Sequence, residues 1–596
     1  MKRIRLIAAL MGAVLLASAP VATAKPPDGA AGNAQVTEIQ LLALNDFHGQ
    51  LEVVNPIASS GGRIGALQGT SPNQTCLPPT CIPAGGAEYL ATHVRDLRST
   101  NPNTLFVSAG DLIGATPLLS ALFHDEPTIE AFNLMGLDYN GVGNHEFDEG
   151  VDELLRMQYG DRKGSGYTPD RPDGCHYADG CGDGDGFGGA AFPFLAANVV
   201  YKDSGETIFP PYAIHHFNGV KVGIVGMTLE GTPLIVSPDG ISSVNFLDEA
   251  ASVNALVPVL KRQGVETIVV LLHEGGSVAA SGNGAGSVSA INSCSNPSGA
   301  LPPIVEAMDD EIDVVVTGHT NWAVNCVIDG KIVTGAASQA RLITDIDIKI
   351  SRATKDVLRV NGVPQITVNN RIVTQAVPKA ADITALMAKY NVLVAPVAAV
   401  VIGNTTQAMV RTELTAARES TLGRLIADAQ LAASQGDGAQ IAFMNPGGIR
   451  SNFDAGPITY GEAFAVQPFS NVVHTKTYTG AQIEMVLEQQ FRTTAGAART
   501  LVLQVSDGFS YTWNPAGPLG DKVDPTSIKL GGVTIDPAGT YRVTMNSFLA
   551  TGGDDFPAFN LGTNLAVGPD DLVALRAYLE ANNPYTPDTD ARIFNP

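Results

Sequence analysis

Apolar runs of strand length recur along the first half of the chain. Leu, Ile and Val dominate residues 38–46, 104–111, 220–228, 266–274 and 313–319. Continuous runs of this kind are typical of strands that are buried on both faces of a sheet. Helical patterns alternate with the runs, over 86–98, 117–136 and 247–263. The alternation predicts a layered α/β domain.

The pattern changes between residues 365 and 400. The segment 382–401 predicts a helix that leads into a second domain. Further helices are predicted over 420–434 and 480–492, and a strand from 439 enters a glycine-rich loop before Arg450. We therefore expect a first domain over 37–365, a linker or hinge helix over 366–400, and a second α/β or α+β domain over 401–596.

The first 24 residues have the composition of a secretory signal peptide. Lys2, Arg3 and Arg5 precede an apolar run, and Ala22 and Ala24 fit a small-residue cleavage site. The apolar run is shorter than the roughly 20 residues that span a bilayer, which favours cleavage over anchoring. We expect a flexible mature N-terminus over 25–36 and an exported protein, secreted, periplasmic or associated with the cell surface, without a membrane span.

The net charge of −23 argues against a nucleic-acid polymer as the main partner. A small phosphorylated substrate stays possible, because bound cations can reverse the local field. The six cysteines of an exported chain favour disulfides over a zinc site, although the sequence leaves their connectivity open. Neighbouring cysteines suggest the pairs Cys76 with Cys81, Cys175 with Cys181, and Cys294 with Cys326.

A glycine- and aspartate-rich segment over 173–189 has two interpretations. Its aspartates, at positions 173, 179, 183 and 185, are oxygen ligands of the kind that calcium prefers. Their spacing does not fit an EF-hand loop. A surface loop is therefore favoured over a structural calcium site.

Polar side chains of metal-ligand type end four of these predicted strands and a fifth run, over 138–148, which reaches Asn144. One such residue has ordinary explanations, such as a helix cap, but five strand ends share the feature. Ligands of open α/β sheets bind outside the carboxyl ends of the strands. The set suits zinc, manganese, iron or cobalt, and it is large enough for two ions that share a carboxylate, as in phosphoryl transfer. It consists of Asp46, His48, Asp111, Asn144, His273, His319 and Asn321.

The motifs around these residues resemble those of the calcineurin-like metallophosphoesterases. They read LNDFHG, GD, GNHEFD, LLHEGG and GHTN, in this order. More narrowly, nearly the whole mature chain resembles the exported 5′-nucleotidase family, which includes UDP-sugar hydrolases and 2′,3′-cyclic nucleotide phosphodiesterases. The resemblance implies an N-terminal αββα sheet sandwich and a C-terminal substrate-binding domain, joined by a helical linker about which the domains rotate.

The resemblance also implies a role for each polar residue. Asp46, His48 and Asn321 match the ligands of one metal. Asn144, His273 and His319 match those of the other, and Asp111 matches the bridging carboxylate. His145 and Asp148 match a catalytic pair, in which the imidazolium stabilises charge on the phosphoryl oxygens while hydroxide held by the metals attacks in line. Glu146 has no role in the family pattern, and we interpret it as structural.

The second domain carries the residues that match a nucleotide pocket. The loop FMNPGGIR contains Asn445, Gly448 and Arg450, of which the Asn and Arg match residues that face the nucleotide. Phe469 and Phe548 match two aromatic residues that enclose the base, and Asp554 matches a contact to the ribose hydroxyls. Stacking contributes about 1–3 kcal/mol per base and tolerates different bases. Without the resemblance, core packing is the simpler interpretation of both Phe residues.

One departure from the family pattern concerns a substrate arginine. Ala416 stands at the position that we align with it, so Arg418 or Arg411 is expected to serve instead. Pro446 also replaces the usual glycine and stiffens the loop. We expect hydrolysis of 5′-nucleotides to nucleoside and phosphate. The alternatives are hydrolysis of UDP-sugars or other pyrophosphates, cleavage of 2′,3′-cyclic nucleotides, or an inactive secreted nucleotide-binding protein. The sequence does not indicate an oligomeric state.

Overall fold

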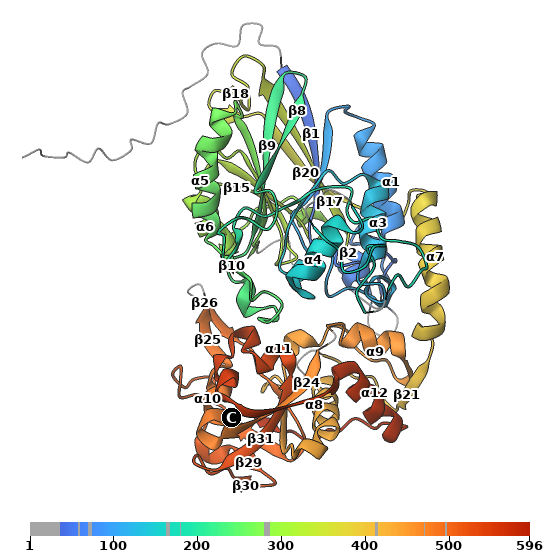
Figure 1. The fold of residues 1–596 in the computed structure, drawn as a ribbon, viewed down its shortest axis with the longest axis vertical. Helices are drawn as coiled ribbons and strands as arrows, with labels where there is room; N and C mark the ends of the chain where they lie inside the picture. The colour runs from blue at the N-terminus through green and yellow to red at the C-terminus, as the bar shows by residue number, and fades with distance from the viewer. Residues whose placement is uncertain are drawn as a thin grey trace, which may run out of the picture.

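The chain folds into two stacked bodies joined along one side by a long helix, α7 (Ala381–Ala398) (Figure 1). The computed structural model describes residues 36–57, 60–69, 74–162, 167–178, 180–278, 287–411, 415–469, 471–494 and 497–595. The predicted signal peptide and the predicted flexible segment up to residue 35 lie outside these residues. No helix in the described ranges is long and apolar enough to cross a membrane.

Two six-stranded sheets form the first body. The first sheet has the order β20 (Ile366–Ile372), β17 (Leu342–Ser351), β1 (Val36–Leu44), β4 (Thr104–Ser108), β5 (Tyr139–Gly141) and β6 (Phe194–Leu195). The second has the order β15 (Ala323–Ile328), β16 (Lys331–Ala336), β14 (Val314–Thr317), β11 (Thr267–His273), β9 (Val220–Thr228) and β8 (Tyr212–Phe217).

Both faces of each sheet are buried, as the apolar runs predict. On β1, Ile39 and Leu41 belong to the core between the sheets, whereas Leu42 and Leu44 pack in the core on the opposite face. On β11, Val269 and Leu271 share the inner core, and alternate residues join the outer core of the second sheet. This alternation follows the two-residue period of a strand.

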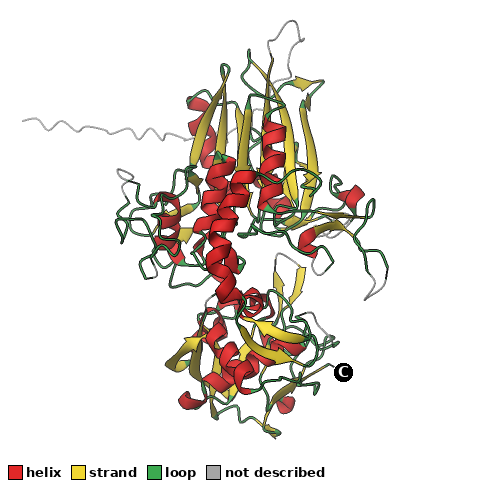
Figure 2. Cartoon of the chain, turned by 90° about the vertical axis from the view of Figure 1, so that its right-hand side faces the viewer, coloured by secondary structure: helices red, strands yellow, loops and turns green. Residues whose placement is uncertain are grey.

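Helices cover the outer faces of the two sheets, on opposite sides of the sandwich in Figure 1, and Figure 2 looks onto the helices of one side. The first sheet is covered by α1 (Ala87–Arg98), α3 (Glu126–Met135) and α4 (Gly150–Tyr159), and the second by α5 (Glu249–Arg262) and α6 (Leu301–Ala307). The predicted αββα sandwich is therefore confirmed.

The helix predicted over 117–136 is broken into α2 (Leu118–Ala121) and α3. His124 and Asp125 take left-handed backbone angles, with φ of 49° and 64°, and a right-handed helix cannot pass through such residues. Asp125 is held there because its carboxylate accepts a hydrogen bond from the Gly114 backbone amide, at 3.0 Å. Helical periodicity alone could not reveal this tertiary bond.

The first sheet also extends past the boundary predicted at residue 365. Strand β20 pairs antiparallel with β17, from Ile348 opposite Ile366 to Leu342 opposite Ile372. Residues up to Ile372 therefore belong to the first domain, and the linker helix begins only at Ala381. One face of α7 is buried. It consists of Ile383, Met387, Tyr390 and Val394, which pack in a hydrophobic core that also contains residues of both bodies.

The second body is built on a five-stranded mixed sheet. Its order is β27 (Gln504–Val505), β22 (Ile441–Met444), β31 (Thr540–Asn546), β24 (Val472–Thr479) and β32 (Thr563–Asp570). The second body also contains the helices α8 (Thr421–Ala433), α10 (Gly480–Glu488) and α12 (Asp571–Ala581). Helix α10 ends before the predicted limit of 492, because Phe491 and Arg492 already pair in the hairpin of β25 (Phe491–Thr494) with β26 (Ala497–Thr500).

Three disulfides join the cysteines in the predicted pairs. They are Cys76–Cys81, Cys175–Cys181 and Cys294–Cys326. All six cysteines are paired, so the alternative of a cysteine-rich zinc site is wrong.

Candidate metal centre and substrate pocket

The predicted metal ligands gather where strands of both sheets end. Asp46, Asp111 and Asn144 follow β1, β4 and β5 of the first sheet, whereas His273 ends β11 and His319 follows β14 of the second. The carboxyl ends of these strands meet at one end of the sandwich. The sequence suggests a single sheet edge, but two sheets contribute to the site.

Several of the ligand candidates have a strained backbone. The φ angles are positive at Asp46 (49°), His48 (50°), Asp111 (52°), His319 (66°) and Asn321 (61°). Non-glycine residues in this region cost of order 1–3 kcal/mol each and persist where the surroundings hold them, often at functional sites. These turns stand at the ends of the strands, where the candidate ligands gather.

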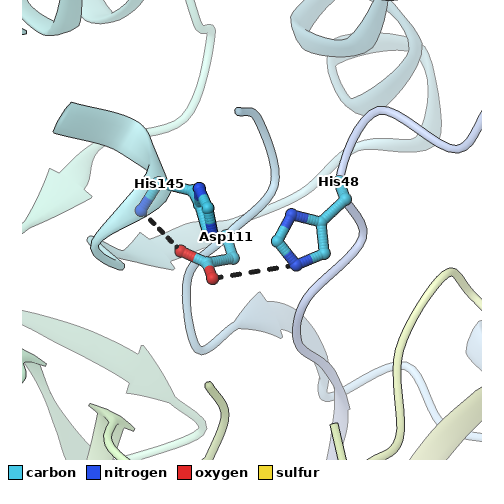
Figure 3. A group of neighbouring side chains, drawn as sticks. All are labelled: His48, Asp111 and His145. Carbon is cyan, nitrogen blue, oxygen red and sulfur yellow. Dashed lines mark hydrogen bonds and ion pairs between the residues drawn. The ribbon is translucent and has the colours of Figure 1, made fainter. Parts of the chain in front are cut away.

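Asp111 lies at the centre of the group (Figure 3). Its Oδ2 atom is 3.0 Å from His273 Nε2 and 3.8 Å from His48 Nε2. Its Oδ1 atom accepts a hydrogen bond from the backbone amide of His145, at 2.9 Å. One buried carboxylate therefore contacts both predicted ligand sets, as a bridging ligand requires.

The two ligand sets lie on either side of Asp111. Asn144 Oδ1 is 3.1 Å from His273 Nε2 and 2.9 Å from His319 Nδ1, which defines one set. On the other side, Asp46 Oδ1 is 3.9 Å from His48 Nε2. Asn321 stands two residues after His319 and donates its side-chain amide to the His319 carbonyl oxygen, at 3.2 Å.

Backbone carbonyl groups orient two of the imidazoles. His48 Nδ1 pairs with Gly114 O at 3.0 Å, and His273 Nδ1 pairs with Ala109 O at 2.6 Å. Each ring therefore points its Nε2 atom at the centre, which is the usual way in which proteins fix a metal-ligating histidine.

Glu146 and Asn45 support the centre from outside it. The Glu146 carboxylate accepts hydrogen bonds from the backbone amides of Asp111, Leu112 and Gly143, at 2.8–2.9 Å, which agrees with its structural interpretation. Asn45 donates to Asp46 Oδ2 at 2.6 Å. The sequence reasoning missed Asn45, and its only signal was its place beside Asp46.

The protonation chemistry of this group fits divalent cations. Burial lowers the pKa of His48 to about 4 and that of His319 to about 3, which keeps both rings neutral. Burial would raise the pKa of Asp111, but His273 and His145 hold it well below its usual range. Asp46 Oδ1 is buried without a hydrogen-bond partner in the described part of the chain. Burial raises the pKa of Asp46 to about 7, and Asp111 outweighs the effect of burial to raise that of His273 to about 10. A cation would therefore meet neutral His48 and His319 and an ionised Asp111, and would displace the proton of His273 on binding.

His145 and Asp148 form the predicted pair beside this centre. His145 Nδ1 lies 2.7 Å from Asp148 Oδ2. Burial alone would lower the pKa of His145, but the charges of Asp148 and Asp111 outweigh it and raise the pKa to about 9. A charged imidazolium with its Nε2 available is thereby stabilised next to the metal ligands.

Two predicted substrate residues of the second domain reach this same place. The Phe469 ring lies nearly parallel to the His145 ring, with centroids 6.1 Å apart. The Arg450 guanidinium lies 5.6 Å from the centre of the Phe469 ring. The pKa of Arg450 is lowered by burial and by nearby Arg411, and the charges of Asp148 and Asp111 act in the opposite direction. The two domains therefore meet at the metal centre.

The other predicted substrate residues form a second group. Asn445 donates to Asp554 Oδ2 at 2.7 Å, and Asn546 donates to Asn445 Oδ1 at 2.9 Å. A Cβ on Gly448 would lie 2.9 Å from Asn445 Oδ1, so a larger residue would crowd this pair. The half-buried Phe548 ring packs beside Gly553, next to Asp554.

The substitute arginines lie near the glycine-rich loop. Arg411 and Arg418 line a 250 Å³ cavity together with Pro446 and Gly447. Arg411 donates to the carbonyl oxygens of Ile449 and Arg450, at 2.9 and 3.1 Å, whereas Arg418 donates to Thr500 O at 3.4 Å. Ala416 is exposed. Of the two arginines, Arg411 is the one that holds the loop.

The predicted calcium ligands are engaged elsewhere. Asp183 and Asp185 both pair with Lys389, and Asp173 pairs with Arg171. Residue 179 lies outside the described residues. The described aspartates of this segment thus act as ion-pair partners, and the metal-competent groups of the described residues do not include them.

Family comparisons agree with this division of the chain. A family model for calcineurin-like phosphoesterases matches residues 39–322, a range that contains every predicted metal ligand and the His145–Asp148 pair. A model for the 5′-nucleotidase C-terminal domain matches residues 401–561, which contain the predicted substrate residues. The first domain is thus a calcineurin-like phosphoesterase domain. The chain belongs to the 5′-nucleotidase family, in which that domain is combined with a 5′-nucleotidase C-terminal domain.

Individual relatives and solved structures extend along most of the chain. Endonuclease YhcR of Bacillus subtilis is 32% identical over 548 residues, which cover 91% of this chain and 40% of that protein. Cell wall protein Lmo0130 of Listeria monocytogenes is 30% identical over 577 residues, or 90% of this chain and 66% of that protein. The chain thus spans less than two thirds of the length of both relatives. A 5′-nucleotidase precursor from Thermus thermophilus has a TM-score of 0.67 at 24% identity, covering 94% of this chain and 99% of that structure.

Proposed function

We propose that this protein is an exported, two-metal phosphohydrolase that removes the phosphate from 5′-nucleotides. The observation that carries the proposal is the meeting of Arg450 and Phe469, from the second domain, with His145 and the buried ligand group of the first. A nucleotide has an anionic end and an aromatic end. Cationic and aromatic side chains next to a metal-ligand group suit such a molecule.

In this proposal, two divalent cations would supply Lewis acidity and a nucleophile near neutral pH. Zinc is the first candidate, and manganese, cobalt and iron are the others. One cation would be held by Asp46, His48 and Asn321, and the other by Asn144, His273 and His319. Asp111 would bind both cations. His145 donates from its charged ring to the phosphoryl oxygens, and Asp148 keeps that ring charged and oriented.

The second domain selects the substrate. Phe469 and Phe548 would enclose the base, and Asp554, held by Asn445, would accept from the ribose hydroxyls. Arg450 would bind the anionic end, while Arg411 supports its loop from the cavity that Arg418 also lines. The linker helix α7 would act as the hinge between the two domains, with the first domain extending to Ile372.

A second candidate is cleavage of a phosphodiester or pyrophosphate bond, as in UDP-sugars or 2′,3′-cyclic nucleotides. The exposed Ala416 at the position aligned with a substrate arginine favours it, because the terminal phosphate has one fixed cation fewer. The name of the B. subtilis relative, an endonuclease, also describes a diesterase. The net charge of −23 argues against a polymeric nucleic acid as substrate.

A substrate panel separates these functions. Purified protein is assayed against AMP, UDP-glucose, 2′,3′-cyclic AMP and single-stranded DNA, each with Zn²⁺, Mn²⁺, Co²⁺ or Mg²⁺. The proposal expects the highest kcat/KM for AMP. If AMP is the poorest of the small substrates, the monoesterase assignment fails. If no substrate turns over with any metal but AMP binds to the protein, the protein is a nucleotide-binding protein instead.

A further inference from the structure

A second cluster of metal-ligating side chains lies outside the site already described. It consists of His124, Glu149 and His176, whose potential ligand atoms all lie within 4.8 Å of one another. His124 Nδ1 is 2.8 Å from Glu149 Oε2. The two imidazole rings are stacked, with centroids 3.6 Å apart and an angle of 15° between their planes.

The three residues come from separate segments of the first domain. His124 stands in the break between α2 and α3, with a positive φ of 49°. Glu149 immediately precedes α4, and His176 is adjacent to the Cys175–Cys181 disulfide. The disulfide therefore restrains the backbone at Cys175, the residue before His176. His176 is 7% exposed, so one ligand of the cluster is already buried.

Two imidazoles and one carboxylate are a known ligand class for zinc and similar divalent ions, with a fourth position left for water. The side chain of Glu149 is 48% exposed, which leaves that fourth position open to solvent. The stacked rings do not share a plane, so one ring has to rotate before both can direct an in-plane lone pair at the same ion. His124, with a side chain that is 19% exposed, is the freer of the two to rotate, because His176 is only 7% exposed.

A cavity leads to this cluster. It has a volume of 410 Å³ and is lined by Glu149 and His176 together with Asp152, Glu153 and Asp170. Arg156 also lines it, but its guanidinium is paired with Glu126 and Glu153. The lining therefore carries a net negative charge, which suits the approach of a hydrated cation.

The cluster is also connected to the metal centre. Asp125, next to His124, accepts a hydrogen bond from Gly114 N at 3.0 Å, and Gly114 O pairs with His48 Nδ1 at 3.0 Å. Glu149 directly follows Asp148, the partner of His145. An ion bound between His124, Glu149 and His176 would fasten together the segments that carry His48 and Asp148.

We propose that His124, Glu149 and His176 form a third divalent-metal site of the zinc class, separate from the two-metal centre. It holds the α2–α3 break, the start of α4 and the disulfide loop to one another. The site is independent of which nucleotide the enzyme hydrolyses.

The test counts zinc ions per chain by mass spectrometry after equilibration of the full-length protein in buffered Zn²⁺. We compare wild type with His176→Asn and Glu149→Gln, and use His216→Asn, at an exposed histidine of β8, as the matched control. Each cluster variant is expected to bind one zinc ion fewer than wild type, and the control the same number. Thermal unfolding should show that Zn²⁺ raises the Tm of wild type and the control more than that of the variants.

A variant of the main centre distinguishes the two sites. Asp111→Asn is expected to lose zinc from the main centre and to keep the ion that His176→Asn loses. If His176→Asn and Glu149→Gln both fold, by circular dichroism, and bind as much zinc as wild type with unchanged affinity, the third site does not exist. If His176→Asn fails to fold, Glu149→Gln alone decides, because its half-exposed side chain can change without disturbing packing. If Asp111→Asn loses zinc from the main centre but keeps the third ion, the third site is supported. That result does not depend on which substrate the panel identifies.

Discussion

The metal centre and the substrate pocket are built in opposite ways. In the first domain, five of the seven ligand candidates are buried, six are joined by contacts of 2.9–3.9 Å, and five have a strained backbone. In the second domain, the substrate residues are joined in pairs, such as Asn445 with Asp554, and Phe469 and Phe548 are half-buried. If the proposed function holds, the comparison teaches that the chemistry rests on a buried, closely connected group of side chains, whereas recognition rests on half-buried side chains.

The largest effect is expected from Asp111→Asn. This change removes the charge that both ligand sets share, and leaves an amide 3.0 Å from His273 Nε2. Bound metal should fall below that of wild type, and turnover of AMP should drop by several orders of magnitude, because both cations lose a ligand. Metal content and kcat are measured on the same preparation. Full metal content with normal turnover would contradict the shared role of Asp111.

The next largest effect is expected from His145→Asn. Its backbone amide still binds Asp111, so the metal content should stay unchanged, whereas kcat should fall about 10²–10⁴-fold through loss of the charged ring. His216→Asn serves as the control and should leave kcat unchanged. A loss of metal in His145→Asn would show that this residue acts as a ligand rather than as a donor to the phosphate.

Asp148→Asn tests how the ring of His145 is kept charged. The Asp148 carboxylate raises the pKa of His145, so removing its charge lowers that pKa. Activity depends on the protonated ring and is lost as the pH rises through the pKa of His145. The alkaline limb of the kcat profile should therefore move to lower pH in Asp148→Asn. An alkaline limb that stays in place, or moves to higher pH, would remove Asp148 from this role.

A small effect is expected from Arg411→Ala. Arg411 holds the backbone of Ile449 and Arg450 by two hydrogen bonds, and the loss of such bonds at an exposed position is worth about 1 kcal/mol. The KM for AMP should rise about fivefold with little change in kcat. The control is Arg576→Ala, whose exposed side chain pairs with Glu580 on α12. A fall in kcat at constant KM would place Arg411 in the chemistry instead.

The sequence predicted that most of the ligand candidates would gather where strands end, because that signal is local. Asp46, Asp111, Asn144 and His319 each follow an apolar strand within a few residues, and the ends of parallel strands converge in any such sheet. The neighbouring cysteines likewise predicted three disulfides that the structure contains. These predictions needed no knowledge of how distant segments pack.

Other features depend on tertiary contacts that no local pattern carries. The break at His124 and Asp125 rests on a bond to Gly114, and strand β20 joins the first sheet only through its pairing with β17. The cluster of His124, Glu149 and His176 comes from three segments without a common motif. The approach of Phe469 to His145 depends on how the two domains sit against each other. Neither periodicity nor motif spacing carries information about any of these four features.

The division between chemistry and recognition is tested most directly by two substrates and two variants. We compare kcat/KM for AMP and for p-nitrophenyl phosphate, which lacks base and ribose, in His145→Asn and Phe548→Ala. His145→Asn should lower both values by a similar factor. Phe548→Ala should lower the value for AMP by about 5–150-fold, the equivalent of about 1–3 kcal/mol of stacking, and leave that for p-nitrophenyl phosphate within about twofold. Equal losses on both substrates in Phe548→Ala would contradict the account.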